Sequence, residues 1–515
     1  MKDIIEECRS QYRHYVEDQV LVVGPEDEIE AVLRAIQDEF DVDLEMATDG
    51  KTELWQLNWD PSKEELVGPC LEGILPELYE CLKKRLEVHL YKIRRRQPGI
   101  YEPGLIEHVV QHINRGDVSP CVRADLNWLT GYPYSVAGSP YSVAGSPYSV
   151  AGSPYSVAGS PYTKHGGPVG PDDFWNQWAL EKIGLMSNGN RVVDGLGQNV
   201  QVGVFDTSPF AESGTPEPAS DGHPPHLTVV HPWVFEHLRL PPPPPPQSIG
   251  AGPPPAPPDL SSHGLSVAGL VYAVAPGSDI YLYRVLDKHA RGNLFVLCYA
   301  LVQFLMDVLS DQKPRSGGII NLSLGLDLPH DWQDLAGSGS IFALDIVLAL
   351  AHCLGLTVVA ASGNRSAGRP AAVPAEFPAS QPYAIGVMAS NYDDDRSCFS
   401  NLGDLTAPGG DGYDCRAHRR PKSRYDTCQC PWDIATIDRW KYGLIGPVLP
   451  NREFPQGFAR WIGTSFAAPL VSGMAALMRE HHGGSPPMGV SGEILNHLRP
   501  GGSGIVAGII DVQGY

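Results

Sequence analysis

The sequence predicts an α/β fold with a doubly wound parallel sheet, preceded by a small α+β domain. From Asp172 onwards, short runs rich in Val, Ile and Leu alternate with helical patterns. Continuous apolar strands separated by helices are typical of a parallel sheet covered on both faces. Residues 1–93 show a different order, in which strands follow one another directly, and a repeat containing Gly and Pro separates the two regions.

The first region predicts the order βαββαβ, which is that of a split βαβ, or ferredoxin-like, sheet. QVLVVG at 19–24 is strand-like, and EDEIEAVLRAIQDEF at 26–40 has the periodicity of an amphipathic helix. The turn Asp49-Gly50 lies between two strand-like runs and predicts a hairpin. A helical stretch through LEGILPELYECLKKRL and a strand LEVHLYKI complete the order. We interpret residues 94–130 as a connector with one short helical pattern, LIEHVVQHI.

The repeat YSVAGSP occurs four times in tandem, starting at Tyr134, Tyr141, Tyr148 and Tyr155. Gly and Pro in every unit exclude a helix, although the seven-residue period is that of a coiled coil. We interpret the repeat as a flexible spacer that expanded by duplication, and a set of exposed cleavage sites or excised peptides is the alternative. The predicted organisation is a domain at 1–130, a linker at 131–171 and a domain at 172–515, with insertions at about 216–258 and 410–458.

The chain has 515 residues, with 59 acidic and 38 basic side chains and a formal net charge of −21. Such a surface repels nucleic acid and anionic lipid, so neither is an expected partner. No apolar run is long enough to span a bilayer, and the N-terminus has acids where a signal peptide needs bases, which predicts a cytoplasmic protein. The ten cysteines are scattered, and we expect most of them to be reduced and buried.

Four polar residues of the second domain lie where a strand ends or a helix begins. Asp206 closes the strand QVGVF, and Asn364 follows the strand LTVVAASG. His263 opens the helix of HGLSVAG, and Ser465 opens the helix that continues as FAAPLVSGMAALM. Functional groups of a doubly wound sheet gather at the carboxyl ends of its strands, so the four side chains are expected to converge.

The four residue types fit nucleophilic catalysis. A serine hydroxyl needs an adjacent base, so His263 would take the proton of Ser465, and Asp206 would orient the imidazole and stabilise its cation. The side-chain amide of Asn364 and the backbone N–H of Ser465 would donate to a developing oxyanion. Taken singly, each residue has an ordinary structural alternative: a turn or cap for Asp206, Asn364 and Ser465, and a partly buried core position for His263.

Along the chain the four residues follow the order Asp, His, Asn, Ser, and in this order they resemble the site residues of the subtilisin-like serine proteases, or subtilases. HGLSVAG is similar to the family's HGTHVAG motif, AASGN to its oxyanion segment, and GTSFAAP to the GTSMAAP around the nucleophile. VGVFDTS and NLSLG also have counterparts, and the resemblance extends over about 172–515 apart from the two insertions. The departures are Ser266 for the second histidine of the first motif, Phe466 for a methionine, and Ser208-Pro209 where the family often has glycine.

The resemblance implies an endopeptidase that hydrolyses peptide bonds through an acyl-enzyme on Ser465. It also implies that one wall of the substrate cleft is lined by Ser323, Leu324 and Gly325, and that Gly363 lies beside the side chain that precedes the scissile bond. No organic cofactor is implied. Structural calcium is common in the family, but the sequence places no site for it.

The resemblance also implies a role for the N-terminal domain. Subtilases are commonly made with a propeptide of βαββαβ form, which assists folding and then inhibits the site until it is cleaved. Residues 1–130 resemble such a propeptide, which implies a zymogen cut between Leu129 and Asp172. The expected partners are a polypeptide substrate and this domain, with no nucleic acid and no membrane. A separate recognition domain is the alternative.

Two other function classes stay open, namely an inactive binding module and a maturation protease that acts on one partner or on its own repeat. The insertion at 410–458 also contains candidate zinc ligands: Cys415, His418, Cys428 and Cys430. Three thiols and an imidazole suit zinc, but Cys-x-Cys is not the usual spacing. A loop with free thiols or one disulfide explains the same residues.

Overall fold

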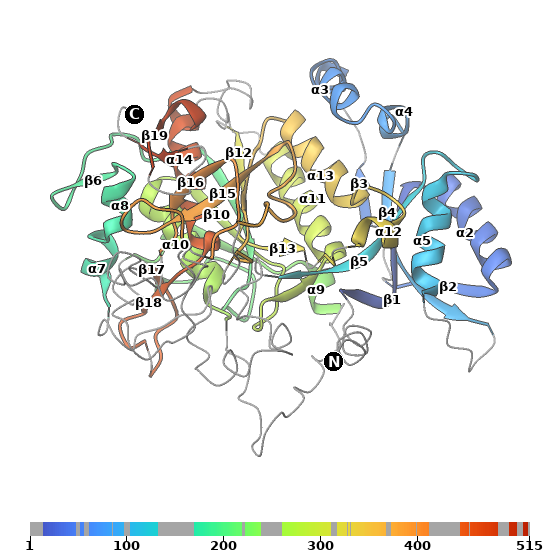
Figure 1. Ribbon diagram of the computed structural model, residues 1–515, viewed down its shortest axis with the longest axis horizontal. Coiled ribbons are helices and arrows are strands. Elements are labelled where there is room, and N and C mark those ends of the chain that lie inside the picture. Colours follow the sequence, from blue (N-terminus) through green and yellow to red (C-terminus); the bar gives the residue numbers. More distant parts are fainter. Residues whose placement is uncertain are drawn as a thin grey trace, which may run out of the picture.

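The computed structural model contains a small domain that packs beside a larger α/β domain (Figure 1). It describes residues 14–47, 52–55, 61–84, 86–96, 104–131, 169–218, 222–237, 260–310, 317–326, 328–329, 331–366, 372–397, 399–410, 443–452, 454–482, 494–501 and 508–512. The YSVAGSP repeats and the candidate zinc ligands Cys415, His418, Cys428 and Cys430 lie outside the described residues.

Antiparallel strands form the sheet of the N-terminal domain, in the order β5-β1-β4-β2. These strands are β1 (Tyr15–Pro25), β2 (Val42–Met46), β4 (Leu86–Arg95) and β5 (Arg123–Gly131). Helix α2 (Glu26–Phe40) connects β1 to β2, and α5 (Leu105–Arg115) connects β4 to β5. The last of these strands along the chain, β5, therefore lies beside the first, β1, as in a split βαβ sheet.

The elements that fill this order differ from those expected. The strand at 86–93 is not the last strand of this domain, because residues 94–130, interpreted as a connector, supply α5 and β5. The turn Asp49-Gly50 of the expected hairpin lies outside the described residues, and the strands on either side of it, β2 and β3 (Thr52–Trp55), each pair with β4 rather than with one another. Residues 105–115 belong to the domain rather than to a connector because the apolar face of α5 is buried in the core. The buried residues of this face are Ile106, Val109, Val110 and Ile113.

Between β3 and β4 the chain adds two helices, α3 (Pro61–Ile74) and α4 (Tyr79–Leu82). In Figure 1 they lie apart from α2 and α5, above β3 and β4. They are an insertion relative to the strand–helix order of the sheet, and α3 contains Cys70.

The large domain is built on a nine-stranded sheet, in which β19 is the antiparallel strand. The spatial order is β19 (Leu498–Arg499), β20 (Ile509–Ile510), β16 (Leu405–Pro408), β15 (Ala384–Ser390), β14 (Thr357–Ala361), β12 (Gly318–Leu322), β8 (Gln201–Asp206), β10 (Asp279–Arg284) and β9 (Leu227–Val230). Central strands are buried along their whole length, as both faces are covered. The predicted α/β fold with a doubly wound parallel sheet is confirmed.

Helices cover the two faces of this sheet. On one face, α10 (His263–Val274) and α14 (Thr464–His482) share an apolar core with the strands. On the other face lie α11 (Leu294–Ser310) and α13 (Phe342–Cys353), whose apolar side chains belong to the same core cluster as those of the N-terminal domain. The N-terminal domain thus packs against the α11 and α13 side, as Figure 1 shows.

The strand order reverses at β8. The chain first builds β9 and β10 on one side of β8 and then crosses to β12 on the other. Ligands of doubly wound sheets bind at such a switch point, outside the carboxyl ends of the strands. Asp206 is the last residue of β8, and Ser323 directly follows β12, so both lie at this point.

Both insertions contain regular structure. The Pro-rich insertion was expected to be an extended surface loop, which is wrong for its middle part. Leu227 and Val229 of β9 are buried at the sheet edge, and α9 (Trp233–His237) follows. In the second insertion, β17 (Leu444–Pro447) pairs with β18 (Phe458–Trp461) against α10.

Shorter elements complete the large domain. They are α7 (Pro171–Trp175), α8 (Trp178–Lys182), β6 (Met186–Ser187), β7 (Asn190–Arg191), β11 (Arg291–Asn293), β13 (Gly325–Leu326) and α12 (Trp332–Ala336). None of the helices in the described parts of the chain is both long and apolar enough to cross a lipid bilayer.

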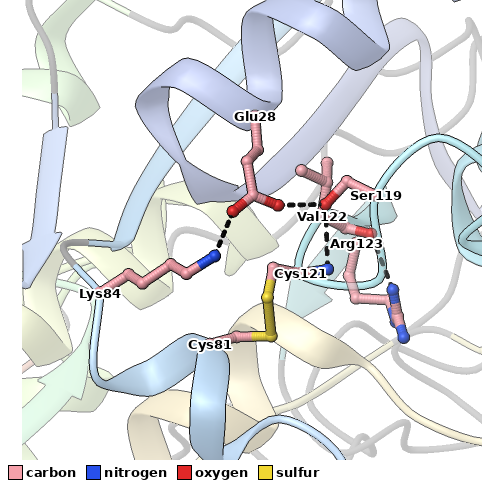
Figure 2. Close-up of a disulfide and its surroundings, with 7 residues drawn as sticks. All are labelled: Glu28, Cys81, Lys84, Ser119, Cys121, Val122 and Arg123. Atoms are coloured by element: carbon pink, nitrogen blue, oxygen red, sulfur yellow. Dashed lines mark hydrogen bonds and ion pairs between the residues drawn. A yellow bond between two sulfur atoms is a disulfide. The ribbon is translucent and has the colours of Figure 1, made fainter.

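The described cysteines differ from the expectation that most of the cysteines are reduced. Cys70 is bonded to Cys353 and Cys81 to Cys121, whereas Cys298 is a buried free thiol. Figure 2 shows the second disulfide, which joins α4 to the segment before β5. Beside it, the Glu28 carboxylate pairs with Lys84 at 2.5 Å and accepts a hydrogen bond from Ser119. Scattered positions gave no sign of pairing because the partners meet only through tertiary packing.

Candidate active site

Asp206 and His263 form a buried pair at the switch point. Nδ1 of His263 lies 3.0 Å from both carboxylate oxygens of Asp206, and both side chains are fully shielded from solvent. The backbone N–H of Thr207 donates to Oδ1 of Asp206 at 2.6 Å. A carboxylate held in this way fixes the imidazole with its N–H on Nδ1, so that Nε2 is the basic nitrogen.

Thr207 joins the end of β8 to the start of α10. Its hydroxyl donates to the carbonyls of Leu260 and Ser261 and accepts from the N–H of Gly264, at 2.9–3.1 Å. A Cβ on Gly264 would lie 2.2 Å from the Thr207 carbonyl oxygen, so only glycine allows this approach. The sequence showed these residues only as neighbours of Asp206 and His263; their function is to set the distance between the two.

Ser465 lies in the first turn of α14 and is 1% exposed. Its Oγ donates to the carbonyl oxygen of Ser323 at 3.1 Å, and Oγ of Ser323 donates back to the carbonyl oxygen of Ser465 at 2.7 Å. The next residue, Phe466, packs on the ring of His263 with 4.8 Å between ring centroids, and Trp461 contacts the same ring edge-on. The nucleophile candidate and the base candidate are thus brought to one place from β12, α14 and α10.

Asn364 is held by the residue that precedes Ser465. Its Oδ1 accepts hydrogen bonds from the backbone N–H and the hydroxyl of Thr464, both at 3.1 Å. A backbone N–H can only donate, so this contact fixes Oδ1 toward Thr464 and makes Nδ2 the donor end of the amide. Thr464 was not among the predicted site residues, although its position next to Ser465 in Gly-Thr-Ser could have indicated its role.

Gly363 is packed where no side chain fits. It has φ +108°, and a Cβ would lie 2.4 Å from the amide nitrogen of Asn401 and 2.8 Å from a carboxylate oxygen of Glu376. Its N–H donates to the Thr464 hydroxyl at 3.2 Å, which ties it to the segment of Asn364 and Ser465. Leu324 is fully buried between Ser323 and β13.

The end of β5 lies between two short strands of the large domain. Gly131 pairs with Arg291 of β11 on one side and with Gly325 of β13 on the other. Thr130 likewise pairs with Gly292 and Leu326, and Leu129 with Asn293. Gly325 is two residues from Ser323, which contacts Ser465, and the antiparallel register directs β5 toward that serine. No local feature of residues 123–131 predicted this contact.

Polar side chains of the N-terminal domain fix the same strand to helix starts of the large domain. Asp125 accepts hydrogen bonds from the N–H groups of Phe342 and Ala343 at the start of α13, at 3.0 and 2.8 Å. Asn127 accepts one from Phe295 at the start of α11. Burial raises the pKa of Asp125 to about 7, against the influence of those two N–H groups, and burial raises the pKa of Asp345 to about 6.

The part of the chain that the structure describes has no group of three or more His, Cys, Asp or Glu side chains arranged to hold a metal ion. No described residue is therefore assigned to calcium. The arrangement of Asp206, His263, Asn364 and Ser465 supplies a base, a hydroxyl and hydrogen-bond donors, which is the equipment of acyl transfer.

The family model described as "Subtilase family" matches residues 248–507, just over half of the chain. The match begins after Asp206, so the pairing of Asp206 with His263 is an observation of the structure that is independent of it.

Among curated proteins, alkaline elastase YaB of Bacillus sp. (strain YaB) is 28% identical over 267 residues, covering 48% of this chain and 53% of the relative. Subtilisin E of Bacillus subtilis (strain 168) is 31% identical over 237 residues, covering 44% and 47%. Subtilisin-like protease 3 of Pseudogymnoascus destructans is 27% identical over 299 residues, covering 56% and 60%.

The chain spans about half the length of the curated relatives it matches. A solved structure of a cold adapted subtilisin-like serine proteinase aligns with 66% of this chain and 98% of that one, at 20% identity and a TM-score of 0.42. Since the family model covers more than half of the sequence, the chain belongs to the subtilase family.

Proposed function

We propose that the chain is a serine endopeptidase that hydrolyses peptide bonds through an acyl-enzyme on Ser465. The observation that carries this proposal is the fully buried Asp206–His263 pair beside Ser465, whose neighbour Phe466 packs on the imidazole. A turn residue or a helix cap does not account for a carboxylate that contacts an imidazole with both oxygens. Polypeptides are the proposed substrates.

In the proposed mechanism, Ser465 Oγ turns from the Ser323 carbonyl toward Nε2 of His263 and attacks the substrate carbonyl carbon. Its proton passes to Nε2, and Asp206 stabilises the imidazolium. Nδ2 of Asn364 and the backbone N–H of Ser465 donate to the oxyanion. When the C–N bond breaks, His263 gives the proton to the leaving amine. Water then attacks the acyl-enzyme by the same route and restores Ser465.

The experiment that tests this function is active-site labelling. We expect a fluorophosphonate probe to modify the activated chain at one residue, which peptide mapping identifies as Ser465, with loss of fluoride. Ser472 is the matched control, because it lies on the same helix α14 and its hydroxyl donates to Asn321. A Ser472→Ala chain should be labelled like the wild type. Labelling at another residue, or no labelling of the activated chain, contradicts the proposal.

We further propose that the N-terminal domain, residues 1–130 as predicted, is a propeptide that keeps the site silent. The pairing of Leu129, Thr130 and Gly131 with β11 and β13 supports this, because it fills the edge positions that an extended substrate would use. The register directs the chain toward Ser465, so we expect the first cut within about three residues beyond Gly131, at the rise of an extended strand. That position, like the linker at 131–171, lies almost wholly outside the described residues.

This arrangement favours a self-processing zymogen over the other function classes. A separate recognition domain would not need its last strand beside Ser323. A dedicated maturation protease stays the second candidate, because the repeats that begin at Tyr134 follow directly after the paired strand. The inactive binding module is disfavoured by the contacts of Asp206, His263 and Asn364. The cytoplasmic location stays a prediction, and the two disulfides are of a kind that persists in oxidising compartments.

The buried Asp125 makes the docked state sensitive to pH. Its pKa of about 7, against an ordinary 3.8, means that the docked carboxyl keeps a proton where an exposed one loses it. The stabilisation is therefore complete below about pH 4 and is lost as the pH rises toward 7. The loss is at most about 4 kcal/mol.

An Asp125→Asn change should remove this dependence, since an amide cannot ionise. In a background of Ser465→Ala, which excludes self-cleavage, thermal melting is measured from pH 4 to 8. We expect the Asn variant to gain in melting temperature relative to Asp as the pH rises. A difference that is constant over this range contradicts the assignment. Asp345, with its pKa of about 6, still titrates in both chains.

A further inference from the structure

We propose that cutting the linker does not release the N-terminal domain, and that the active site opens only when the Cys70–Cys353 disulfide is reduced. This inference rests on the proposed function, in which the N-terminal domain occupies the cleft. It adds a chemical condition for activation: proteolysis and reduction are both required.

The bond joins the two domains directly. Cys70 belongs to α3, the insertion of the N-terminal domain, and Cys353 is the last residue of α13 in the large domain. Their Cα atoms are 5.7 Å apart, and they are separated by 283 positions in the sequence. The linker at 131–171 lies within that interval, so a chain cut there remains one covalent molecule. Residues 1–131 would stay attached to α13.

The other disulfide provides an internal comparison. Cys81 and Cys121 are 40 positions apart, and both lie within the N-terminal domain (Figure 2). Reducing that bond detaches nothing from the large domain. The two disulfides of the described residues therefore have different consequences, and only Cys70–Cys353 acts as a tether.

A tether makes the docking of β5 intramolecular. A flexible covalent link holds two binding surfaces at an effective concentration of about 1 mM, so each dissociation of the strand is followed by rebinding. The remaining contacts strengthen this, because Gln111 and Asn114 of α5 donate to carbonyls of Asp334 and Ala336 of α12. After reduction, a cut domain can diffuse away, and its rebinding depends on the protein concentration.

The redox step needs a dithiol reductant. A thiolate of the reductant attacks one sulfur of the disulfide, forms a mixed disulfide with that cysteine and releases the other cysteine as a thiolate. The second thiol of the reductant then displaces the remaining cysteine from the mixed disulfide. Two electrons and two protons pass to Cys70 and Cys353, which become thiols, and the reductant leaves as a disulfide. Cys353 is 8% exposed and Cys70 is half-buried, so Cys70 is the more exposed residue of the pair.

The test uses the full chain with one YSVAGSP unit replaced by a recognition site for a sequence-specific protease, so that the cut does not depend on self-processing. After the cut, the protein is analysed on gels with and without dithiothreitol. We expect one species of full mass without reductant and two fragments with it. Hydrolysis of a peptide substrate at micromolar or lower protein should rise at least about tenfold upon reduction, because the tethered effective concentration is lost.

Two double variants separate the tether from other effects of reduction. The cut Cys70→Ser/Cys353→Ser chain should be active without dithiothreitol. The cut Cys81→Ser/Cys121→Ser chain should still need it. If the latter variant is active without reductant, unfolding of the domain and not loss of the tether opens the site, and the proposal is wrong. Separation of the wild-type fragments without reductant also overturns it.

The tether proposal and the protease proposal are contradicted by different results. If the cut, unreduced chain reacts with a fluorophosphonate as fast as the reduced chain, the tether proposal fails while the protease stands. If neither the cut and reduced wild type nor the cut Cys70→Ser/Cys353→Ser chain reacts, the protease proposal itself fails.

Discussion

Replacing Ser465 with alanine is expected to lower kcat for peptide hydrolysis by about 10⁶-fold. The residue lies in the first turn of α14, its Oγ donates a hydrogen bond to the Ser323 carbonyl, and the next residue, Phe466, packs on the imidazole of His263. Alanine removes the only atom that can form the acyl-enzyme, while the fold loses one hydrogen bond. The measurement is steady-state hydrolysis of a peptide substrate by cut and reduced protein, with melting temperature as the check on folding.

Ser472→Ala is the control for this change, since it removes a buried hydroxyl from the same helix. It should keep kcat within about threefold of the wild type. The lost hydrogen bond should lower the free energy of unfolding by about 1 kcal/mol. The Ser465→Ala chain should also stay uncut in the linker when it is incubated alone. Cutting of purified Ser465→Ala protein at the wild-type rate would show that another group is the nucleophile.

Replacing Asp206 with asparagine is expected to lower kcat by about 10⁴-fold without unfolding the protein. The N–H of Thr207 donates to Oδ1 at 2.6 Å and would hold the amide oxygen of asparagine in the same position. The amide NH₂ would then face Nδ1 of His263. The imidazole would have to accept on Nδ1 and carry its proton on Nε2, so that Nε2 could no longer take the proton of Ser465.

Asp279→Asn is a suitable control for this variant. Asp279 opens β10 opposite Gln201, at the other end of the β8–β10 pair from Asp206. Its replacement should leave kcat unchanged within about threefold, the spread expected for a substitution far from the reacting atoms. The assignment of Asp206 would be wrong if Asp206→Asn retained a tenth or more of the wild-type kcat with an unchanged KM.

The parts of the fold that the sequence predicted are those where local pattern and chemistry agree. Strands β8, β12 and β14 are buried on both faces, and their continuous apolar runs are visible in the sequence itself. The four polar residues were found because each follows a strand or opens a helix. Their convergence follows from a parallel sheet, in which all carboxyl ends meet at one edge.

The parts that the sequence did not predict depend on contacts between distant segments. The role of β5 is decided by its pairing with β1, β11 and β13, and no local feature of residues 123–131 distinguishes it from a connector. The Cys70–Cys353 bond follows from the packing of α3 on α13. Thr464 and Thr207 were overlooked because their contribution is a hydrogen bond to a neighbour of the reacting group.

Strand β5 belongs to the sheet of the N-terminal domain and also pairs with β11 and β13 of the large domain. Residues such as Ala124 and Leu126 pair with β1 within the N-terminal core, whereas Leu129 pairs with β11, and Thr130 and Gly131 lie between β11 and β13. The three terminal residues cannot separate from β11 and β13 unless the strand bends or the whole small sheet moves with them. We therefore expect substitutions at Val22 or Leu21 of β1, which pair with β5, to change how long the proposed enzyme stays latent.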